Sequence, residues 1–256
     1  MERFAEIDKT LKKDGYTRRQ LFDWIQRYYP HYDDHSCAWI LGSLLSRGVL
    51  YNAGFDAYFK KGNSFECPIP KSAAIQDLQS VLWHLDPRAK YVSYSPSDLN
   101  GLLGDESCLD LIIFEVEKKH LYPLYLELKA KTKSSILLNP TSDERDRYYS
   151  DGCVLLRPLP SKAPCDNGLL ALEKLCVDLL KSKDLEAAFP LLEPENVIEK
   201  ILEEYDVNIK TLLSYAERRG VRNKMITLIH SSLPSDKIKI LEFSSKFPKL
   251  SKEYVP

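Results

Sequence analysis

The residues best suited to catalysis are one carboxylate and a Glu-x-Lys pair further along the chain. Asp110 lies in an apolar run, and Glu127-Leu128-Lys129 follows it. A carboxylate on one strand and a Glu-x-Lys on the next can hold a magnesium ion and position an attacking water. Asp110, Glu127 and Lys129 therefore define one alternative, a metal-dependent nuclease.

This restriction-endonuclease-like alternative requires residues 124–129 to form a strand. Three leucines there alternate with Tyr125, Glu127 and Lys129, as in a strand. The apolar residues also recur at helical spacing, and Pro123 is accepted in the first turn of a helix. The periodicity leaves strand and helix open, and no second carboxylate is evident on the face of Asp110.

Two other groups of charged residues are expected to have structural rather than catalytic roles. Glu115 and Glu117 share one face of a strand and Lys118 projects to the other, as where a strand emerges into solvent. Three charges of a later segment are expected to be ordinary exposed helix charges: Glu173, Lys174 and Asp178.

No motif in the sequence indicates that the protein binds a cofactor. The sequence has no phosphate-binding glycine loop and no nucleophile motif. His31 and His35 are four residues apart, but turn and capping roles account for them and for the two aspartates between them. We therefore expect neither a metal nor a cofactor.

One predicted helix has a surface suited to a DNA groove. Asp33 or Asp34 can cap it, its buried face would be Cys37, Ile40, Leu41 and Leu44, and Gly48 would end it. At about 100° per residue, the opposite face consists of His35, Trp39, Gly42, Ser43 and Ser46. Small and polar side chains let a helix approach base edges. Docking of a protein, or packing of Trp39 on a neighbouring hairpin, is the alternative.

The flanking elements complete the pattern of a winged helix. A helix is expected over residues 2–13, and the capping box Thr17-Arg18-Arg19-Gln20 opens another that Pro30 ends. Residues 49–51 and 57–59, joined through Asn52-Ala53-Gly54, are the predicted wing. The candidate DNA contacts are the basic residues and the outward helix positions: Arg18, Arg19, His35, Ser36, Trp39, Ser43, Arg47, Lys60 and Lys61.

The rest of the chain predicts an α/β section followed by helices. A winged-helix domain is assigned to residues 1–66 and a second domain to 67–256, with Gly62, Pro68 and Pro70 in the linker. Predicted strands at 90–94, 109–116, 136–138 and 154–156, with helices at 72–85, 96–103 and 142–149, indicate a mixed or parallel sheet. Past Pro164 we expect helices only, at 169–180, 194–205, 209–218 and 221–231. The lysine-rich tail after Ser235 is expected to be loosely attached.

Composition favours a soluble globular protein without a strong polyanion affinity. Hydrophobic residues make up 44% and charged residues 29%, and the net charge is −1. The six cysteines have no metal-site spacing and are expected to be reduced core residues. No apolar leader and no stretch of roughly 18 apolar residues is present, so a cytoplasmic protein is expected.

The order of several segments resembles the AbiEi family, over about residues 16–220. The N-terminal part of the resemblance lies in Arg18-Arg19-Gln20-Leu21-Phe22-Asp23-Trp24 and Phe114-Glu115-Val116-Glu117-Lys118. It continues through Ile136-Leu137-Leu138-Asn139-Pro140 and Leu155-Leu156-Arg157-Pro158-Leu159. The helical part is similar in Leu172-Glu173-Lys174-Leu175-Cys176-Val177-Asp178-Leu179-Leu180 and Leu212-Leu213-Ser214-Tyr215-Ala216-Glu217-Arg218-Arg219.

The resemblance implies an antitoxin of a type IV toxin–antitoxin system, a class of phage defence. Such proteins bind repeats at their own promoter with the N-terminal domain. Their C-terminal domain counteracts a nucleotidyltransferase toxin by a route that need not involve a stable complex. Catalysis is not implied, and a monomer or weak dimer is expected. The corresponding antitoxin-domain motif comprises Glu115, Glu117, Lys118, Glu173, Lys174, Asp178, Arg218 and Arg219.

Two consequences of the resemblance bear on the residues above. Glu117-Lys118 would belong to a structural strand, and Glu127-x-Lys129 to a helix, rather than to a nuclease. The sequence departs from the usual antitoxin at its DNA-facing helix, which begins with two aspartates and has no arginine before Arg47.

Overall fold

The chain divides into two compact units. The computed structural model describes residues 11, 14–64, 73–104, 106–109, 111–131, 135–166 and 168–248. Unit 1 consists of residues 1–65 and 198–256, and unit 2 of residues 66–197. The division expected from sequence placed residues 198–256 with the α/β section, whereas the compact units group them with the N-terminal segment. The expected boundary near residue 66 coincides with the start of unit 2.

The N-terminal segment of unit 1 is built from a three-stranded antiparallel sheet and two helices. The elements are β1 (Gly15–Thr17), α2 (Arg18–Tyr28), α3 (Asp34–Ser46), β2 (Leu50–Gly54) and β3 (Ala57–Lys60), and the strand order is β1-β3-β2. Thr17 Oγ1 accepts the Gln20 amide at 3.2 Å, and Gln20 Oε1 accepts the Thr17 amide at 2.9 Å. The predicted capping box is confirmed. Asp33 caps α3, and Gly48 has a φ of 67°, as its predicted C-terminal role requires.

Apolar residues of both helices meet one face of this sheet. Leu21 and Ile25 of α2 pack with the predicted stripe of α3, Cys37, Ile40, Leu41 and Leu44. Tyr16, Leu50 and Tyr58 supply the sheet side of this core. The helix expected over residues 2–13 lies outside the described residues, apart from Leu11, which is buried in the same core.

The turn of the β2-β3 hairpin differs from the predicted one. Residues Phe55 and Asp56 form the turn, with φ values of 54° and 57°. Two consecutive positive φ values are the requirement of a type I′ turn, which matches the twist of hairpin strands. Asn52-Ala53-Gly54, the predicted turn, is the end of β2 and contains a register shift.

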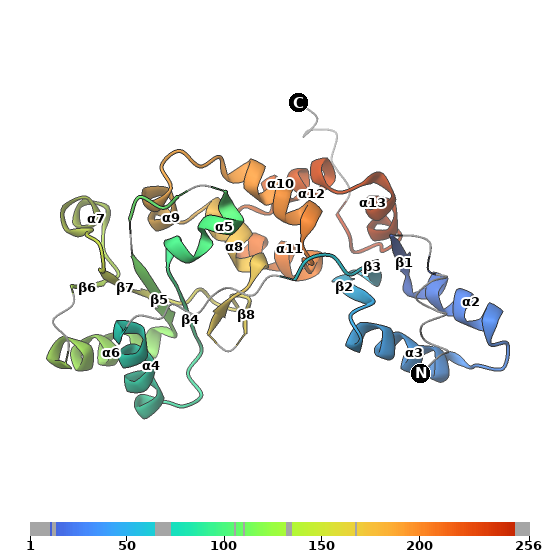
Figure 1. Ribbon diagram of the computed structural model, residues 1–256, viewed down its shortest axis with the longest axis horizontal. Coiled ribbons are helices and arrows are strands. Elements are labelled where there is room, and N and C mark those ends of the chain that lie inside the picture. The colour runs from blue at the N-terminus through green and yellow to red at the C-terminus, as the bar shows by residue number, and fades with distance from the viewer. Residues whose placement is uncertain are drawn as a thin grey trace. The chain divides into compact units, whose positions relative to one another are not determined.

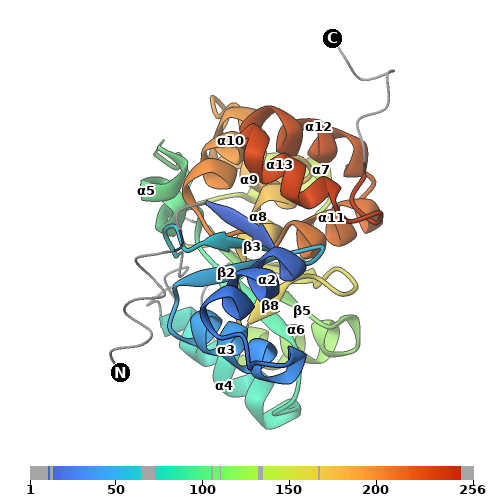
Figure 2. The same cartoon turned by 90° about the vertical axis from the view of Figure 1, so that its right-hand side faces the viewer.

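The C-terminal helices are an integral part of unit 1. They are α10 (Pro194–Glu204), which starts in unit 2, α11 (Ile209–Arg218), α12 (Arg222–Ser232) and α13 (Ser235–Glu242). Ile238, Ile240 and Leu241 of α13 are buried, and Figure 2 shows α13 on the side of the sheet away from α2 and α3. The expectation of a loosely attached tail after Ser235 is wrong for residues 235–248, because these apolar side chains cover the second sheet face.

Unit 2 contains a four-stranded mixed sheet. Its strands are β4 (Tyr91–Tyr94), β5 (Ile112–Val116), β6 (Ile136–Leu138) and β7 (Val154–Pro158), in the order β4-β5-β7-β6. β4 is antiparallel to β5, whereas β5 and β6 both run parallel to β7. The predicted mixed sheet is therefore confirmed. A small hairpin, β8 (Cys165–Asp166) and β9 (Leu169–Leu170), corrects the expectation of helices only after Pro164.

Helices cover both faces of the unit 2 sheet (Figure 1). One face packs against α4 (Ala73–Leu85) and α6 (Lys118–Lys131), with Phe114 and Leu156 in the shared core. Because side chains alternate along a strand, Glu115 and Arg157 point to the other face. That face meets α8 (Leu172–Leu179) and α9 (Lys183–Ala188). The remaining helices of this unit are η1 (Pro96–Leu99), α5 (Asn100–Leu103) and α7 (Ser142–Tyr148).

Candidate functional site

Helix α3 presents a small, polar and aromatic surface to solvent. His35, Trp39, Gly42 and Ser46 are exposed, Trp39 to 65%. Ser43 is half-buried on the same side. The prediction that these residues lie opposite the buried stripe agrees with their exposure. We call His35, Trp39, Gly42, Ser43 and Ser46 the α3 face.

The start of α3 is fixed by its capping aspartate. The Ser36 amide donates a hydrogen bond to Asp33 Oδ1 at 2.8 Å. Hydrogen bonding from Ser36 lowers the pKa of Asp33, so the cap remains a carboxylate at neutral pH. Ser36 is therefore partly engaged in capping, while Arg47 at the other end of α3 is exposed.

Arginines at the start of α2 lie beside a hollow of about 910 Å³. The Arg18 guanidinium is 5.1 Å from the centroid of the Phe22 ring, and Arg19 is exposed. Lys210 and Lys246 line the same hollow from the C-terminal part of unit 1. Cations from both ends of the chain therefore lie beside the first turn of α2, and Asp23, Asp34 and Asp56 line the same hollow.

Lys60 and Lys61 lie at the base of the hairpin rather than at its tip. Lys60 pairs with Leu50 across the hairpin, and a Cβ built on Gly48 would be 3.2 Å from Lys61 Cδ. Both lysines are exposed. They are therefore placed near the C-terminal end of α3, as Arg47 is.

The tip of the hairpin is covered by the C-terminal part of unit 1. Asn208 Nδ2 donates a hydrogen bond to the Asn52 carbonyl at 3.1 Å. The rings of Phe55 and Phe247 are 5.5 Å apart in an edge-on arrangement. The tip of the hairpin is therefore packed against other residues of unit 1.

A buried group of charges lies on the second face of the unit 2 sheet. Lys174 Nζ is 2.7 Å from Glu115 Oε2 and also forms an ion pair with Asp178 Oδ2. Lys174 is fully buried, and Asp178 and Glu115 are exposed to only 3% and 8%. Lys174 also lies 5.9 Å from the centroid of the Tyr94 ring, and burial raises the pKa of the Tyr94 hydroxyl well above its usual value. We call Glu115, Lys174, Asp178 and Tyr94 the Lys174 cluster.

A second buried ion pair adjoins α9. Arg157 Nη2 donates to Asp184 Oδ1 at 2.7 Å, and Tyr149 Oη donates to the same carboxylate. Burial, followed by the hydrogen bond to Asp184, raises the pKa of Tyr149. Burial alone would lower the pKa of Arg157, but the negative charge of Asp184 outweighs it and the net shift is upward.

The expectation of exposed charges at Glu115, Lys174 and Asp178 is wrong. Helix α8 is apolar on all sides apart from its charged residues, and such a helix is usually buried. That pattern could have indicated the burial of Lys174 and Asp178, which sit four residues apart on one helix face. Nothing local to Arg157 or Asp184 could have indicated their pairing, because they are 27 positions apart.

Glu117 and Lys118 do not join the Lys174 cluster. Strand β5 ends at Val116, and Lys118 is the first residue of α6 and exposed. Glu117 Oε2 accepts the Lys90 amide at 3.3 Å and is 3.8 Å from Lys119 Nζ. The predicted strand through residues 115–118 is therefore too long by two residues.

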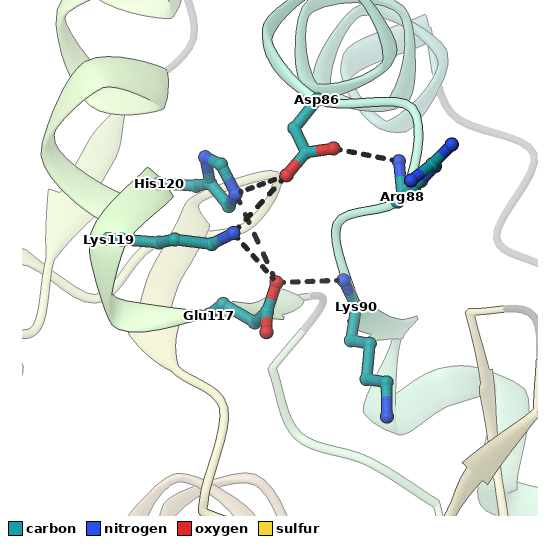
Figure 3. Close-up of polar contacts among 6 residues, drawn as sticks. All are labelled: Asp86, Arg88, Lys90, Glu117, Lys119 and His120. Atoms are coloured by element: carbon teal, nitrogen blue, oxygen red, sulfur yellow. Dashed lines mark hydrogen bonds and ion pairs between the residues drawn. The ribbon is translucent and has the colours of Figure 1, made fainter.

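Asp86 stands next to Glu117 in the arrangement that Figure 3 shows. Its Oδ1 accepts the Arg88 amide at 2.9 Å, and its Oδ2 is 3.0 Å from His120 Nε2 and 3.3 Å from Lys119 Nζ. The Arg88 amide, then Lys119 and His120, lower the pKa of Asp86. Two carboxylates thus hold the backbone of residues 88–90 while α6 supplies their positive partners.

The strand required by the nuclease alternative is not formed. Glu127 and Lys129 lie in α6, so residues 124–129 are helical and the helical option of the sequence is the observed one. Glu127 Oε2 is 3.5 Å from Lys131 Nζ, and Lys129 Nζ is 5.7 Å from the Tyr125 ring centroid. Asp110 lies outside the described residues.

The other members of the predicted motif are spread over both units. Glu173 is half-buried at the start of α8. Arg218 and Arg219 belong to unit 1, where the Arg218 guanidinium is 5.9 Å from the Tyr215 ring centroid. Only Glu115, Lys174 and Asp178 of the eight motif residues come together in one cluster.

The cysteines are free where the structure describes them. Cys37, Cys153 and Cys176 are buried, as expected for core residues. Cys108 is exposed and differs from that expectation. Burial raises the pKa of Cys176, which keeps this thiol protonated at neutral pH.

Fold and site together define a mixed α/β protein with a C-terminal helical region. Residues 36–235 match a family described as "Family of unknown function (DUF6577)". The chain belongs to this family. Comparison with curated proteins gave no match, and neither did comparison with solved structures.

Two features are absent from the described part of the chain. No helix there is long and apolar enough to cross a membrane. Within the same residues, no group of three or more His, Cys, Asp or Glu side chains is placed to hold a metal ion.

Proposed function

We propose that unit 1 is a winged-helix module that binds DNA through the α3 face. The observation that carries this proposal is the exposure of His35, Trp39, Gly42 and Ser46 on the side opposite a fully packed stripe. The Trp39 indole is 65% exposed, and the small polar residues beside it allow close approach to base edges. The β1-α2-α3-β2-β3 order and the antiparallel sheet support the winged-helix assignment.

The cations of unit 1 provide the phosphate contacts in this proposal. Arg18 and Arg19 flank one side of the module, and Arg47, Lys60 and Lys61 gather near the C-terminal end of α3. Phosphate contacts position a protein on DNA without reading sequence. Since the hairpin tip contacts Asn208 and Phe247, base readout is assigned to α3 rather than to the wing.

On the resemblance to AbiEi proteins we further propose a role as a type IV antitoxin and autoregulator. The chain would repress its own promoter and counteract a nucleotidyltransferase toxin without catalysis, in the cytoplasm. The charges of the Lys174 cluster are buried and pair with one another, so we assign this cluster no direct contact with a toxin. The helical placement of Glu127 and Lys129 gives the nuclease alternative no support.

A reporter and toxicity experiment tests both halves of this proposal. The test requires a nucleotidyltransferase gene next to the gene of this chain, and the absence of such a gene contradicts the antitoxin role. The full chain is co-expressed with that nucleotidyltransferase in cells that carry its own promoter fused to a reporter. We expect wild type to repress and to protect, and Trp39→Ala to protect without repressing. If neither wild type nor Trp39→Ala protects the cells, the antitoxin role is contradicted. If wild type and Trp39→Ala repress the reporter equally, DNA binding through the α3 face is contradicted.

A further inference from the structure

A second hollow lies in unit 2, away from the Lys174 cluster. Its volume is about 840 Å³, and its walls come from the end of α4, the loop that leads to β4, and the β8-β9 segment. Trp83, Arg88, Lys90, Tyr91 and Gly168 are among the residues that line it. This volume falls in the range of small-molecule sites, which usually combine aromatic surface with a few placed polar groups.

The backbone that carries the two cations is held in place. Asp86 accepts the Arg88 amide at 2.9 Å, and Glu117 accepts the Lys90 amide at 3.3 Å. Lys119 of α6 forms ion pairs with both carboxylates, and His120 Nε2 also lies 3.0 Å from Asp86 Oδ2. The carboxylates nearest to Arg88 and Lys90 are therefore engaged by side chains of α6 and by the backbone amides of residues 88 and 90.

The side chains of Arg88 and Lys90 remain available. Figure 3 shows both pointing away from the two carboxylates, and both are exposed. Among the described residues, neither side chain forms an ion pair. A guanidinium and an ammonium on a fixed loop are suited to binding phosphate oxygens.

An aromatic surface completes the hollow. Trp83 lies at the edge of the hollow and is 65% exposed, whereas Ile75, Leu78, Val81 and Leu82 of the same helix are buried in the core. Tyr91 is stacked on Phe114, with 5.3 Å between ring centroids, and a Cβ at Gly168 would come within 2.5 Å of its ring. The Tyr91 ring is thus held in place by its neighbours and forms one side of the hollow. The Trp83 ring is exposed and can stack against a planar ligand. Stacking of a base on such a ring is tolerant of base identity.

We propose that this hollow binds a nucleoside phosphate, with its base on Trp83 and its phosphates on Arg88 and Lys90. The ligand is either a free nucleotide or a nucleotide at the 5′ end of an RNA strand. The proposal concerns unit 2 alone and does not depend on DNA binding by unit 1.

Calorimetric titration of the full chain tests this proposal. ATP, GTP, CTP and UTP are titrated separately, with adenosine and inorganic triphosphate as half-ligands. We expect saturable one-to-one binding of at least one nucleotide, and binding about 10-fold weaker or worse for each half-ligand. A 5′-phosphorylated hexaadenylate that binds more tightly than ATP assigns the site to RNA, and the reverse assigns it to free nucleotide.

Variants tie that binding to the hollow. Trp83→Ala and the double variant Arg88→Ala/Lys90→Ala should each weaken binding about 10-fold or more. Both variants keep the backbone amides of residues 88 and 90, which donate hydrogen bonds to Asp86 and Glu117. The matched control Arg147→Ala/Lys181→Ala removes the same two charges from exposed positions of unit 2 and should bind as wild type. Unchanged thermal unfolding shows that each variant is folded.

Three results would overturn the proposal. One is the absence of saturable binding of every nucleotide and of the hexaadenylate at millimolar concentration. Another is wild-type affinity in both Trp83→Ala and Arg88→Ala/Lys90→Ala. The third is tighter binding of a phosphoserine peptide than of any nucleotide, which would assign the cations to a protein partner.

Discussion

Asn208, at the start of α11, donates a hydrogen bond to the carbonyl of Asn52 in β2, 156 positions earlier in the chain. Nearby, Gly62 donates its amide to Asp206 at 2.7 Å, and Asn63 pairs with Tyr205. The hairpin of the N-terminal segment and the C-terminal helices therefore share one folded unit. Cutting the chain near residue 66 would separate parts that fold together, so variants of the full chain are the appropriate test of each role.

Loss of packing from α13 should destabilise unit 1. Leu241 is fully buried, and Leu241→Ala should lower the free energy of unfolding by about 2–5 kcal/mol. Leu191→Ala, at a position 88% exposed, is the control and should change it little. Urea unfolding followed by circular dichroism measures both. Equal stability of the two variants would show that α13 does not contribute to the core.

Removal of the buried cation should cost unit 2 much of its stability. Lys174→Met leaves Glu115 and Asp178 buried without a positive partner, which costs about 3–5 kcal/mol for a broken buried pair. Lys181→Met, at an exposed lysine, is the matched control. The triple variant Lys174→Met/Glu115→Gln/Asp178→Asn should recover part of the loss, since no charge remains in the Lys174 cluster. A Lys174→Met protein as stable as the control would contradict this role.

The contribution of Asp86 should depend on pH. Its folded-state pKa lies below the ordinary 3.8, so its stabilisation is present above that value and is lost as the pH falls through the folded-state pKa. Asp86→Asn should thus be less stable than wild type at pH 7, with a difference that shrinks below pH 3.8. Asp77→Asn, an exposed change on α4, is the control. A difference that is constant from pH 7 to pH 3 would rule out the charged interaction.

The purified chain should not cleave nucleic acid. With Glu127 and Lys129 on a helix, they cannot form the two-strand arrangement of the nuclease alternative. Single- and double-stranded DNA incubated with magnesium or manganese should remain intact on gels. Cleavage that disappears in Glu127→Ala would reinstate that alternative.

The sequence predicted the elements whose signals are local. The capping box at Thr17, the cap at Asp33 and the terminal Gly48 each act within a few residues, and all three are observed. The mixed sheet also followed from short apolar runs separated by helical segments. The hairpin turn was misplaced because Phe55 and Asp56 adopt positive φ without being glycine or asparagine.

The contacts between residues far apart in the chain could not be predicted from the sequence. Glu115 and Lys174 are 59 positions apart (174 − 115), and they form an ion pair only because α8 covers one face of the sheet. Unit 1 likewise joins segments from both ends of the chain, which no local pattern records. The α3 face was predictable because it depends only on helical periodicity.

The most direct test of the central claim compares two equally exposed tryptophans. Trp39 and Trp83 are each 65% exposed, one on the α3 face and the other in unit 2. Fluorescence anisotropy with the chain's own promoter duplex should show Trp39→Ala weakened about 10-fold or more and Trp83→Ala unchanged. Wild type should prefer this duplex to a scrambled one, and its affinity should fall as salt rises. Equal affinity of the two variants for the promoter would contradict DNA recognition by α3.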